Sequence, residues 1–278
     1  MTQLNPHKII TGELKNTAAV GAFNVILLEH AEAIVAGAEK VKLPVVLQIS
    51  QNCVDYHGTL KPIALASKAM AQDSLVNVSL HLDHAESELL VQEALDLGFD
   101  SIMFDGSKLD YAGNVQASIR MAQLCRQYGA TIEVELGEVG GKDGVHAPGI
   151  RTNPAEAQAF VEATGVDLLA VAVGSSHAMT TRDATLDFEL ISQIAKTVSV
   201  PLVLHGSSGV SDEDLQRAVR AGMRKVNIAT HLNHLFTDEI REILNSDSKI
   251  VDPRKYVKSA RNKVANECGR LLQLLALS

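Results

Sequence analysis

The segment VNVSLHLDHAESELLVQEALDLGF, residues 76–99, contains the repeating unit of the fold. It opens with a short alternating run, residues 76–83, which is typical of a β-strand. The residues after it place Leu89, Leu90, Ala94 and Leu97 at helical spacing, and Gly98 is suited to end that helix. The segment therefore predicts a strand followed by a helix.

Seven further runs of the same kind occur along the chain, and most intervals between them show helical periodicity. Eight strand–helix units in about 250 residues predict an α/β fold, a (β/α)8 TIM barrel, as a single domain over residues 1–278 with extra C-terminal helices. A doubly wound open sheet is the alternative, but no G-x-G-x-x-G loop follows the first run. The expected strands are 18–24, 44–50, 76–83, 100–106, 131–136, 168–173, 201–206 and 225–230.

The composition restricts the class of partner. The formal net charge of −8 argues against binding to nucleic acid or to a membrane surface. The three cysteines are widely spaced and form no disulfide framework, and no apolar run approaches the length of a membrane span. We therefore expect a soluble cytoplasmic protein, and the charge does not exclude a local pocket for a phosphorylated metabolite.

Every predicted strand ends in, or is soon followed by, a polar or metal-binding side chain. In a TIM barrel the C-terminal ends of the strands meet around one mouth, where the active site lies. The sequence therefore predicts one pocket, built from Asn24, Gln48, Ser50, Asp83, His84, Asp105, Glu135, His177, His205 and Asn227.

Three of these residues are histidines, His84, His177 and His205, which come from the C-terminal ends of the third, sixth and seventh strands. Three neutral imidazoles with one open position describe a catalytic zinc site. A single histidine at a strand end is more often a solvated or capping residue, but three around one mouth favour Zn²⁺. His81 lies two residues before Asp83, and we expect it to support a ligand from behind.

Two glycine- and hydroxyl-containing loops follow the seventh and eighth strands, where TIM barrels often bind phosphate. The first is Gly206–Gly209, and the second is Asn227–Thr230 at the start of a helix. Either loop alone is equally consistent with an ordinary turn or helix cap. Together they predict an anion site that uses backbone N–H groups and hydroxyls.

The segments LHLDHA, FDGS, VELGEVGG, AVAVGSSH, PLVLHGSSG and KVNIAT occur in this order along the chain. They resemble the class II, metal-dependent ketose-bisphosphate aldolases, most closely the short-chain branch that includes fructose- and tagatose-bisphosphate aldolases. The resemblance implies that the three histidines are zinc ligands and that Asp83 is the proton donor. It also implies that dihydroxyacetone phosphate is held, with the help of Na⁺ or K⁺, by Ala178, Gly206, Ser207, Ser208, Asn227, Ile228, Ala229 and Thr230.

Further roles follow from the same resemblance. Glu135 and Asp105 match acids that lie near the metal and hold it in an alternative position, whereas Asn24, Gln48 and Ser50 match polar residues of the barrel rim. Asp143 is the nearest acid to the position of the base that deprotonates dihydroxyacetone phosphate. Arg254 matches an arginine given across a subunit interface to the second phosphate, so we expect a homodimer or homotetramer.

The predicted reaction is the reversible, zinc-dependent cleavage of a ketose 1,6-bisphosphate, fructose or tagatose, to dihydroxyacetone phosphate and glyceraldehyde 3-phosphate. Cleavage beside a ketone leaves negative charge, which a metal stabilises as a Lewis acid. A Schiff-base lysine is the other route, but no lysine ends the sixth strand, and Lys225 is expected to point to the barrel's other end. The alternatives are an aldolase for a phosphorylated keto-deoxy sugar acid and a non-catalytic sugar-phosphate-binding barrel.

Overall fold

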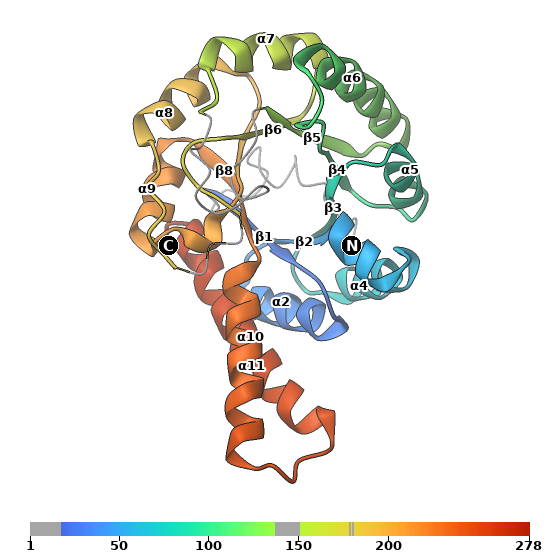
Figure 1. Ribbon diagram of the computed structural model, residues 1–278, viewed down its shortest axis with the longest axis vertical. Helices are drawn as coiled ribbons and strands as arrows, with labels where there is room; N and C mark the ends of the chain where they lie inside the picture. The colour runs from blue at the N-terminus through green and yellow to red at the C-terminus, as the bar shows by residue number, and fades with distance from the viewer. Residues whose placement is uncertain (1–17, 137–150, 178, 180) are drawn as a thin grey trace.

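The chain folds as a closed barrel of eight parallel strands, as predicted (Figure 1). The computed structural model describes residues 18–136, 151–177, 179 and 181–278. Each strand pairs with its neighbours in chain order, and β8 pairs with β1 to close the ring. The strands are β1 Val20–Asn24, β2 Val45–Ser50, β3 Val78–Ala85, β4 Ser101–Phe104, β5 Thr131–Leu136, β6 Leu168–Val171, β7 Leu202–Leu204 and β8 Met223–Ile228.

Helices surround the strands and cover their outer faces (Figure 1). Several begin at side-chain caps: Asn153 accepts from the backbone of Ala155 and Glu156, and Ser211 accepts from Asp214. The helices of the ring are α2 Leu28–Val41, α3 Gln51–His57, α4 Lys61–Asp73, α5 Glu88–Asp96, α6 Tyr111–Tyr128, α7 Pro154–Thr164, α8 Phe188–Thr197 and α9 Asp212–Ala221.

The strands alternate between an apolar outer face and a more polar inner face. On β3, Leu80 and Leu82 belong to the main hydrophobic core, whereas His81 and Asp83 are buried polar residues. This is the two-residue period of a strand whose outer face packs on helices. The barrel interior therefore carries the residues from which a site at its mouth is built.

The eighth strand begins and ends two residues earlier than the sequence pattern indicates, at Met223 and Ile228. Met223 already pairs with Leu202 of β7, so pairing begins directly after Gly222, which ends α9. As a result Thr230 is the first residue of helix α10 and not the end of a strand.

Two C-terminal helices, α10 Thr230–Ser246 and α11 Pro253–Leu275, form an arm that projects from the barrel (Figure 1). The later part of α11 returns to the barrel and packs against α2, and the backbone N–H of Ala19 donates to the carbonyl of Leu275 at 3.2 Å. The predicted extra C-terminal helices are thus confirmed. Within the described ranges, every helix is too short or too polar to span a lipid bilayer.

Candidate active site and metal centre

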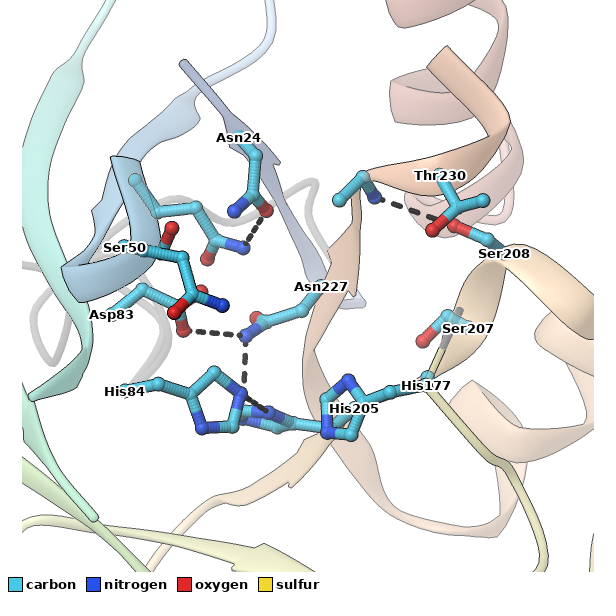
Figure 2. A pocket seen from close by; sticks show the side chains of 14 residues that line it. Asn24, Ser50, Asp83, His84, His177, His205, Ser207, Ser208, Asn227 and Thr230 are labelled. Carbon is cyan, nitrogen blue, oxygen red and sulfur yellow. Dashed lines mark hydrogen bonds between the residues drawn. The ribbon is translucent and has the colours of Figure 1, made fainter. Parts of the chain in front are cut away.

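One pocket lies at the C-terminal ends of the strands and collects most of the predicted residues (Figure 2). It brings together parts of the chain that are far apart in sequence, since β1, β2, β3 and β8 and the segment after β7 all contribute to its wall. Its lining consists of Asn24, Gln48, Ser50, Asn52, Asp83, His84, His177, His205, Gly206, Ser207, Ser208, Asn227, Ala229 and Thr230.

Asp83 and His84 are adjacent in sequence, yet both line this pocket. Consecutive side chains on a regular strand point to opposite faces, so a regular β3 would direct only one of them inward. The strand avoids this constraint because its register with β4 shifts between Leu82 and Ala85, and His84 adopts a positive φ of 49°. A left-handed conformation is uncommon for a residue other than glycine and marks local strain of the kind found at functional sites.

Three imidazoles and one carboxylate converge on a single point beside Asp83. The ligand atoms of His84, Glu135, His177 and His205 all lie within 4.8 Å of one another. The Nδ1 atom of His205 lies 3.0 Å from Nε2 of His84. Imidazole nitrogens and a carboxylate oxygen are the donors that Zn²⁺ prefers, so the group fits a zinc ion.

Carboxylates behind two of the histidines fix which ring nitrogen faces this point. Nδ1 of His84 lies 2.9 Å from Oδ2 of Asp105, and Nε2 of His205 lies 2.9 Å from Oε1 of Glu133. Each carboxylate accepts the ring proton, which leaves Nε2 of His84 and Nδ1 of His205 as the inward-facing atoms. Asp105 therefore sits behind a predicted ligand, outside the converging group.

The negative charge of this site also favours a bound cation. Burial alone would lower the pKa of His84, but Asp83, Asp105 and Glu135 outweigh it and raise that pKa to about 9. Without a metal ion, His84 thus holds a proton at neutral pH. A divalent cation has to displace that proton in order to bind.

We call His84, Glu135, His177 and His205 the metal group. Directly beneath it, the barrel interior contains a fully buried ion pair. Nζ of Lys225 lies 2.8 Å from Oε2 of Glu133, and the exposed fraction of both side chains is 0%. Nε2 of His81 lies 3.4 Å from Nζ of Lys225, and its Nδ1 lies 2.9 Å from the hydroxyl of Ser101. Burial, reinforced by Lys225, lowers the pKa of His81 to about 3, so this ring is neutral.

The buried ion pair and its neighbours bear on what the sequence led us to expect of Lys225 and His81. Lys225 does not point to the far end of the barrel, because its ammonium group is bound to Glu133 immediately below His205. His81 was expected to support a metal ligand; its described contacts are with Ser101 and with the Glu133–Lys225 ion pair, and Glu133 in turn contacts His205. Glu133 was not predicted as a functional residue, although in TIEVEL it shares the inward face with Glu135.

Asp83 is 3% exposed and stands beside the histidines. Burial alone would raise the pKa of its carboxyl group, but the charges of His84 and His205 outweigh burial and lower it. Nδ2 of Asn227 donates to Oδ1 of Asp83 at 3.4 Å. Asp83 is therefore an ionised carboxylate with room to take a proton from a bound molecule.

The turn after β7 is shaped for close approach to the loop that carries His177. Gly206 has a φ of 66°, and a Cβ atom there would meet backbone atoms of Ser176 at 2.6 Å. The next turn, Ser207–Gly209, is a short 3-10 helix. The hydroxyl oxygen of Ser208 accepts from the backbone N–H groups of Ala229 and His231, at 3.3 and 3.1 Å. Ser208 thus caps helix α10 and lines the pocket at the same time.

Comparison with known proteins agrees with this geometry. The family model for class-II fructose-bisphosphate aldolase matches residues 5–278. The chain belongs to the class II fructose-bisphosphate aldolase family. The fructose-bisphosphate aldolase of Geobacillus stearothermophilus is 35% identical over 268 residues, which cover 95% of this chain and 93% of the relative.

Solved aldolase structures share the barrel. The YdjI aldolase of Escherichia coli K12 is 29% identical, with a TM-score of 0.85 over 99% of this chain and 97% of the other. The fructose-bisphosphate aldolase of Campylobacter jejuni is 23% identical, with a TM-score of 0.76 over 98% and 95%, and this likeness shows the fold alone. The protein is thus an aldolase, a carbon–carbon lyase that acts on a ketose bisphosphate.

Some predicted residues of the aldolase lie apart from the pocket. The side chain of Ile228 is 1% exposed within the hydrophobic core, so only its backbone is left to face a ligand. Arg254 lies on the projecting arm, where it pairs with Asp252, and its side chain is 89% exposed. Asp143 and Ala178 lie outside the described residues.

Two pocket features were not evident from sequence. Asn52, in the first turn of α3, lines the pocket without having been predicted, because a helix position carries no strand-end signal. Nε2 of Gln48 donates to Oδ1 of Asn24 at 2.5 Å, which leaves Oε1 of Gln48 buried without a protein hydrogen-bond partner among the described residues. That atom can accept a further hydrogen bond.

Proposed function

We propose that this aldolase is zinc-dependent and reversibly cleaves a ketose 1,6-bisphosphate, fructose or tagatose, to dihydroxyacetone phosphate and glyceraldehyde 3-phosphate. The observation that carries the proposal is the convergence of three imidazoles and a carboxylate within 4.8 Å, beside the buried carboxylate of Asp83. A bound zinc ion supplies a Lewis acid for the ketone oxygen, where cleavage leaves negative charge.

The protein residues divide the remaining work. His84, His177 and His205 hold the metal, Glu135 offers it an alternative oxygen ligand, and Asp105 orients His84. The ionised Asp83 removes the proton of the C4 hydroxyl during cleavage and returns it to the aldehyde oxygen during condensation.

The substrate is held on two sides of the pocket. The Gly206–Ser208 turn and the Asn227–Thr230 segment bind the phosphate of dihydroxyacetone phosphate, assisted by Na⁺ or K⁺. Asn227 also hydrogen-bonds the oxygens of the reacting carbons, since it already lies against Asp83. The opposite wall, Asn24, Gln48 and Ser50, offers amide and hydroxyl groups to the aldehyde half.

The second phosphate requires a cation that the described pocket lining lacks. We propose that a second copy of the chain supplies Arg254, because this side chain extends into solvent on an arm that leads away from its own barrel mouth (Figure 1). The enzyme would then be a homodimer or homotetramer. We place it in the cytoplasm, in keeping with three cysteines that are all free thiols.

Triose phosphate release from fructose 1,6- and tagatose 1,6-bisphosphate, measured with and without chelator, tests the proposal. We expect cleavage of at least one substrate, its loss on chelation and its recovery with Zn²⁺. Full activity after thorough chelation, or inactivation by borohydride in the presence of substrate, contradicts the zinc mechanism, because borohydride traps a lysine Schiff base.

A further inference from the structure

Five ionisable side chains form a continuous series of ion pairs behind the Gly206–Ser208 turn. We call this series the charge chain. It starts in the loop after β6, passes the first residue of α9, continues over α11 and ends in the first turn of α10. Its members are Arg182, Asp212, Arg270, Glu267 and His231.

The first part of the charge chain joins the loop after β6 to the segment after β7. Arg182 donates from Nε to the carbonyl of Val210 at 2.9 Å and pairs with Asp212 at 2.5 Å. The backbone N–H of Ala184 donates to the carbonyl of Gly209 at 3.0 Å. Arg182 is therefore engaged behind the turn and does not line the pocket.

The second part runs through α11. Arg270 ion-pairs with Asp212 and also holds both carboxylate oxygens of Glu267, at 2.8 and 2.7 Å. Oε1 of Glu267 in turn lies 2.6 Å from Nε2 of His231. Burial alone would raise the pKa of Glu267, but the hydrogen bonds from Arg270 and His231 lower it to about 2, so this carboxylate is ionised at neutral pH.

The charge chain ends at the phosphate turn. The backbone N–H of His231, together with that of Ala229, donates to the hydroxyl oxygen of Ser208. Because this oxygen already accepts two hydrogen bonds, the O–H of Ser208 is left to donate, and Ser208 lines the pocket. The position of His231 thus determines where that donor sits.

We propose that Glu267 is a positioning residue for phosphate binding. By holding the imidazole of His231, it fixes the first turn of α10 and, through it, the hydroxyl of Ser208. Helix α11 therefore completes the phosphate site without touching the ligand. This inference rests on the proposed function, which places the phosphate of dihydroxyacetone phosphate at this turn.

Glu239, a second carboxylate that links α10 to α11, serves as a control. It separates an effect on phosphate binding from a general effect on stability. Glu239 of α10 pairs with Lys263 of α11 at 2.9 Å and accepts from the hydroxyl of Ser259 at 2.6 Å. Like Glu267, it ties α10 to α11, but it has no contact with the charge chain. The variants Glu239→Gln and Glu267→Gln each remove one charge from the α10–α11 contact without changing side-chain size.

The test uses zinc-loaded protein and measures the Kd for dihydroxyacetone phosphate, inhibition by inorganic phosphate, KM, kcat, zinc content and melting temperature. We expect Glu267→Gln to weaken phosphate inhibition and dihydroxyacetone phosphate binding roughly fivefold, with kcat and zinc content unchanged. Glu239→Gln should lower the melting temperature to a similar extent and leave both affinities at the wild-type value. Glu267→Ala, which also removes the acceptor for His231, should weaken binding further.

Two results overturn the inference. If Glu267→Gln binds phosphate ligands as tightly as wild type, or no more weakly than Glu239→Gln, then the charge chain is only structural. If wild-type protein shows no competition between inorganic phosphate and dihydroxyacetone phosphate, the phosphate site itself is misplaced and the proposed function fails with it.

Discussion

The buried Glu133–Lys225 pair gives the sharpest test of how the barrel interior controls the metal group. Glu133 accepts the Nε2 proton of His205 at 2.9 Å and thereby keeps Nδ1 available for the metal. Replacing Glu133 alone would leave the ammonium group of Lys225 unpaired at 0% exposure, which costs about 3–5 kcal/mol of stability. That loss would obscure any effect on metal binding, so both charges have to be removed together.

Two double variants isolate the hydrogen bond. Both carry Lys225→Met. One has Glu133→Gln, which keeps an acceptor for His205, and the other has Glu133→Leu, which removes it. In the second variant the Nε2 proton of His205 loses its carboxylate acceptor, so that Asn227, 3.2 Å from Nε2, is its remaining neighbour. The tautomer that places hydrogen on Nδ1 then competes with metal binding.

We expect the Leu variant to bind zinc about 10–100-fold more weakly than the Gln variant, a difference of about 1.4–2.7 kcal/mol. Competition titration with a chromophoric chelator gives the zinc Kd, and thermal unfolding of the metal-free proteins confirms that both are folded. Equal zinc affinities in the two double variants would refute the assignment of Glu133 as the residue that sets the tautomer of His205.

Four further predictions concern the site and the arm. Asp83→Ala should retain zinc, measured by elemental analysis, while kcat falls about 10²–10⁴-fold; loss of the metal instead would reassign Asp83 as a ligand. Because the pKa of metal-free His84 is raised to about 9, zinc must displace its proton at lower pH. The apparent zinc affinity should therefore rise about tenfold per pH unit between pH 7 and 9, and a flat chelator titration over this range would contradict the protonation assigned to His84. Gly206→Ala places a Cβ against the backbone of Ser176, so we expect a higher KM and weaker phosphate inhibition with zinc content unchanged; unchanged inhibition would show that the turn is not a phosphate site. Arg254→Gln should raise KM for the bisphosphate and leave the Kd for dihydroxyacetone phosphate unaltered, and equal effects on both ligands would argue against contact with the second phosphate.

The sequence was sufficient for the barrel and for most of the residues that line its pocket. Eight strand–helix units specify the architecture, and parallel strands necessarily bring their C-terminal ends to one mouth, so residues such as Asp83 and His205 were predictable from position alone. What a linear pattern does not encode is how adjacent residues turn to the same side. The inward orientation of both Asp83 and His84 depends on a register shift and a positive φ.

The interior beneath the site was predictable only in part. Alternation along β5 directs Glu133 inward, but its partner Lys225 comes from β8, which does not pair with β5, and sequence spacing gives no measure of that proximity. The charge chain was unpredictable for the same reason, since Glu267 and His231 meet only because α11 folds back along α10.

The contact between the two ends of the described chain has a consequence for synthesis of the protein. The backbone of Ala19, just before β1, is bonded to Leu275, and α11 packs along α2. During translation, β1 and α2 leave the ribosome well before α11, the helix against which α2 packs. The nascent polypeptide therefore exposes the face of α2 that α11 covers until α11 emerges. A ribosome-arrested chain lacking residues 253–278 should accordingly be far more sensitive to protease than the released protein.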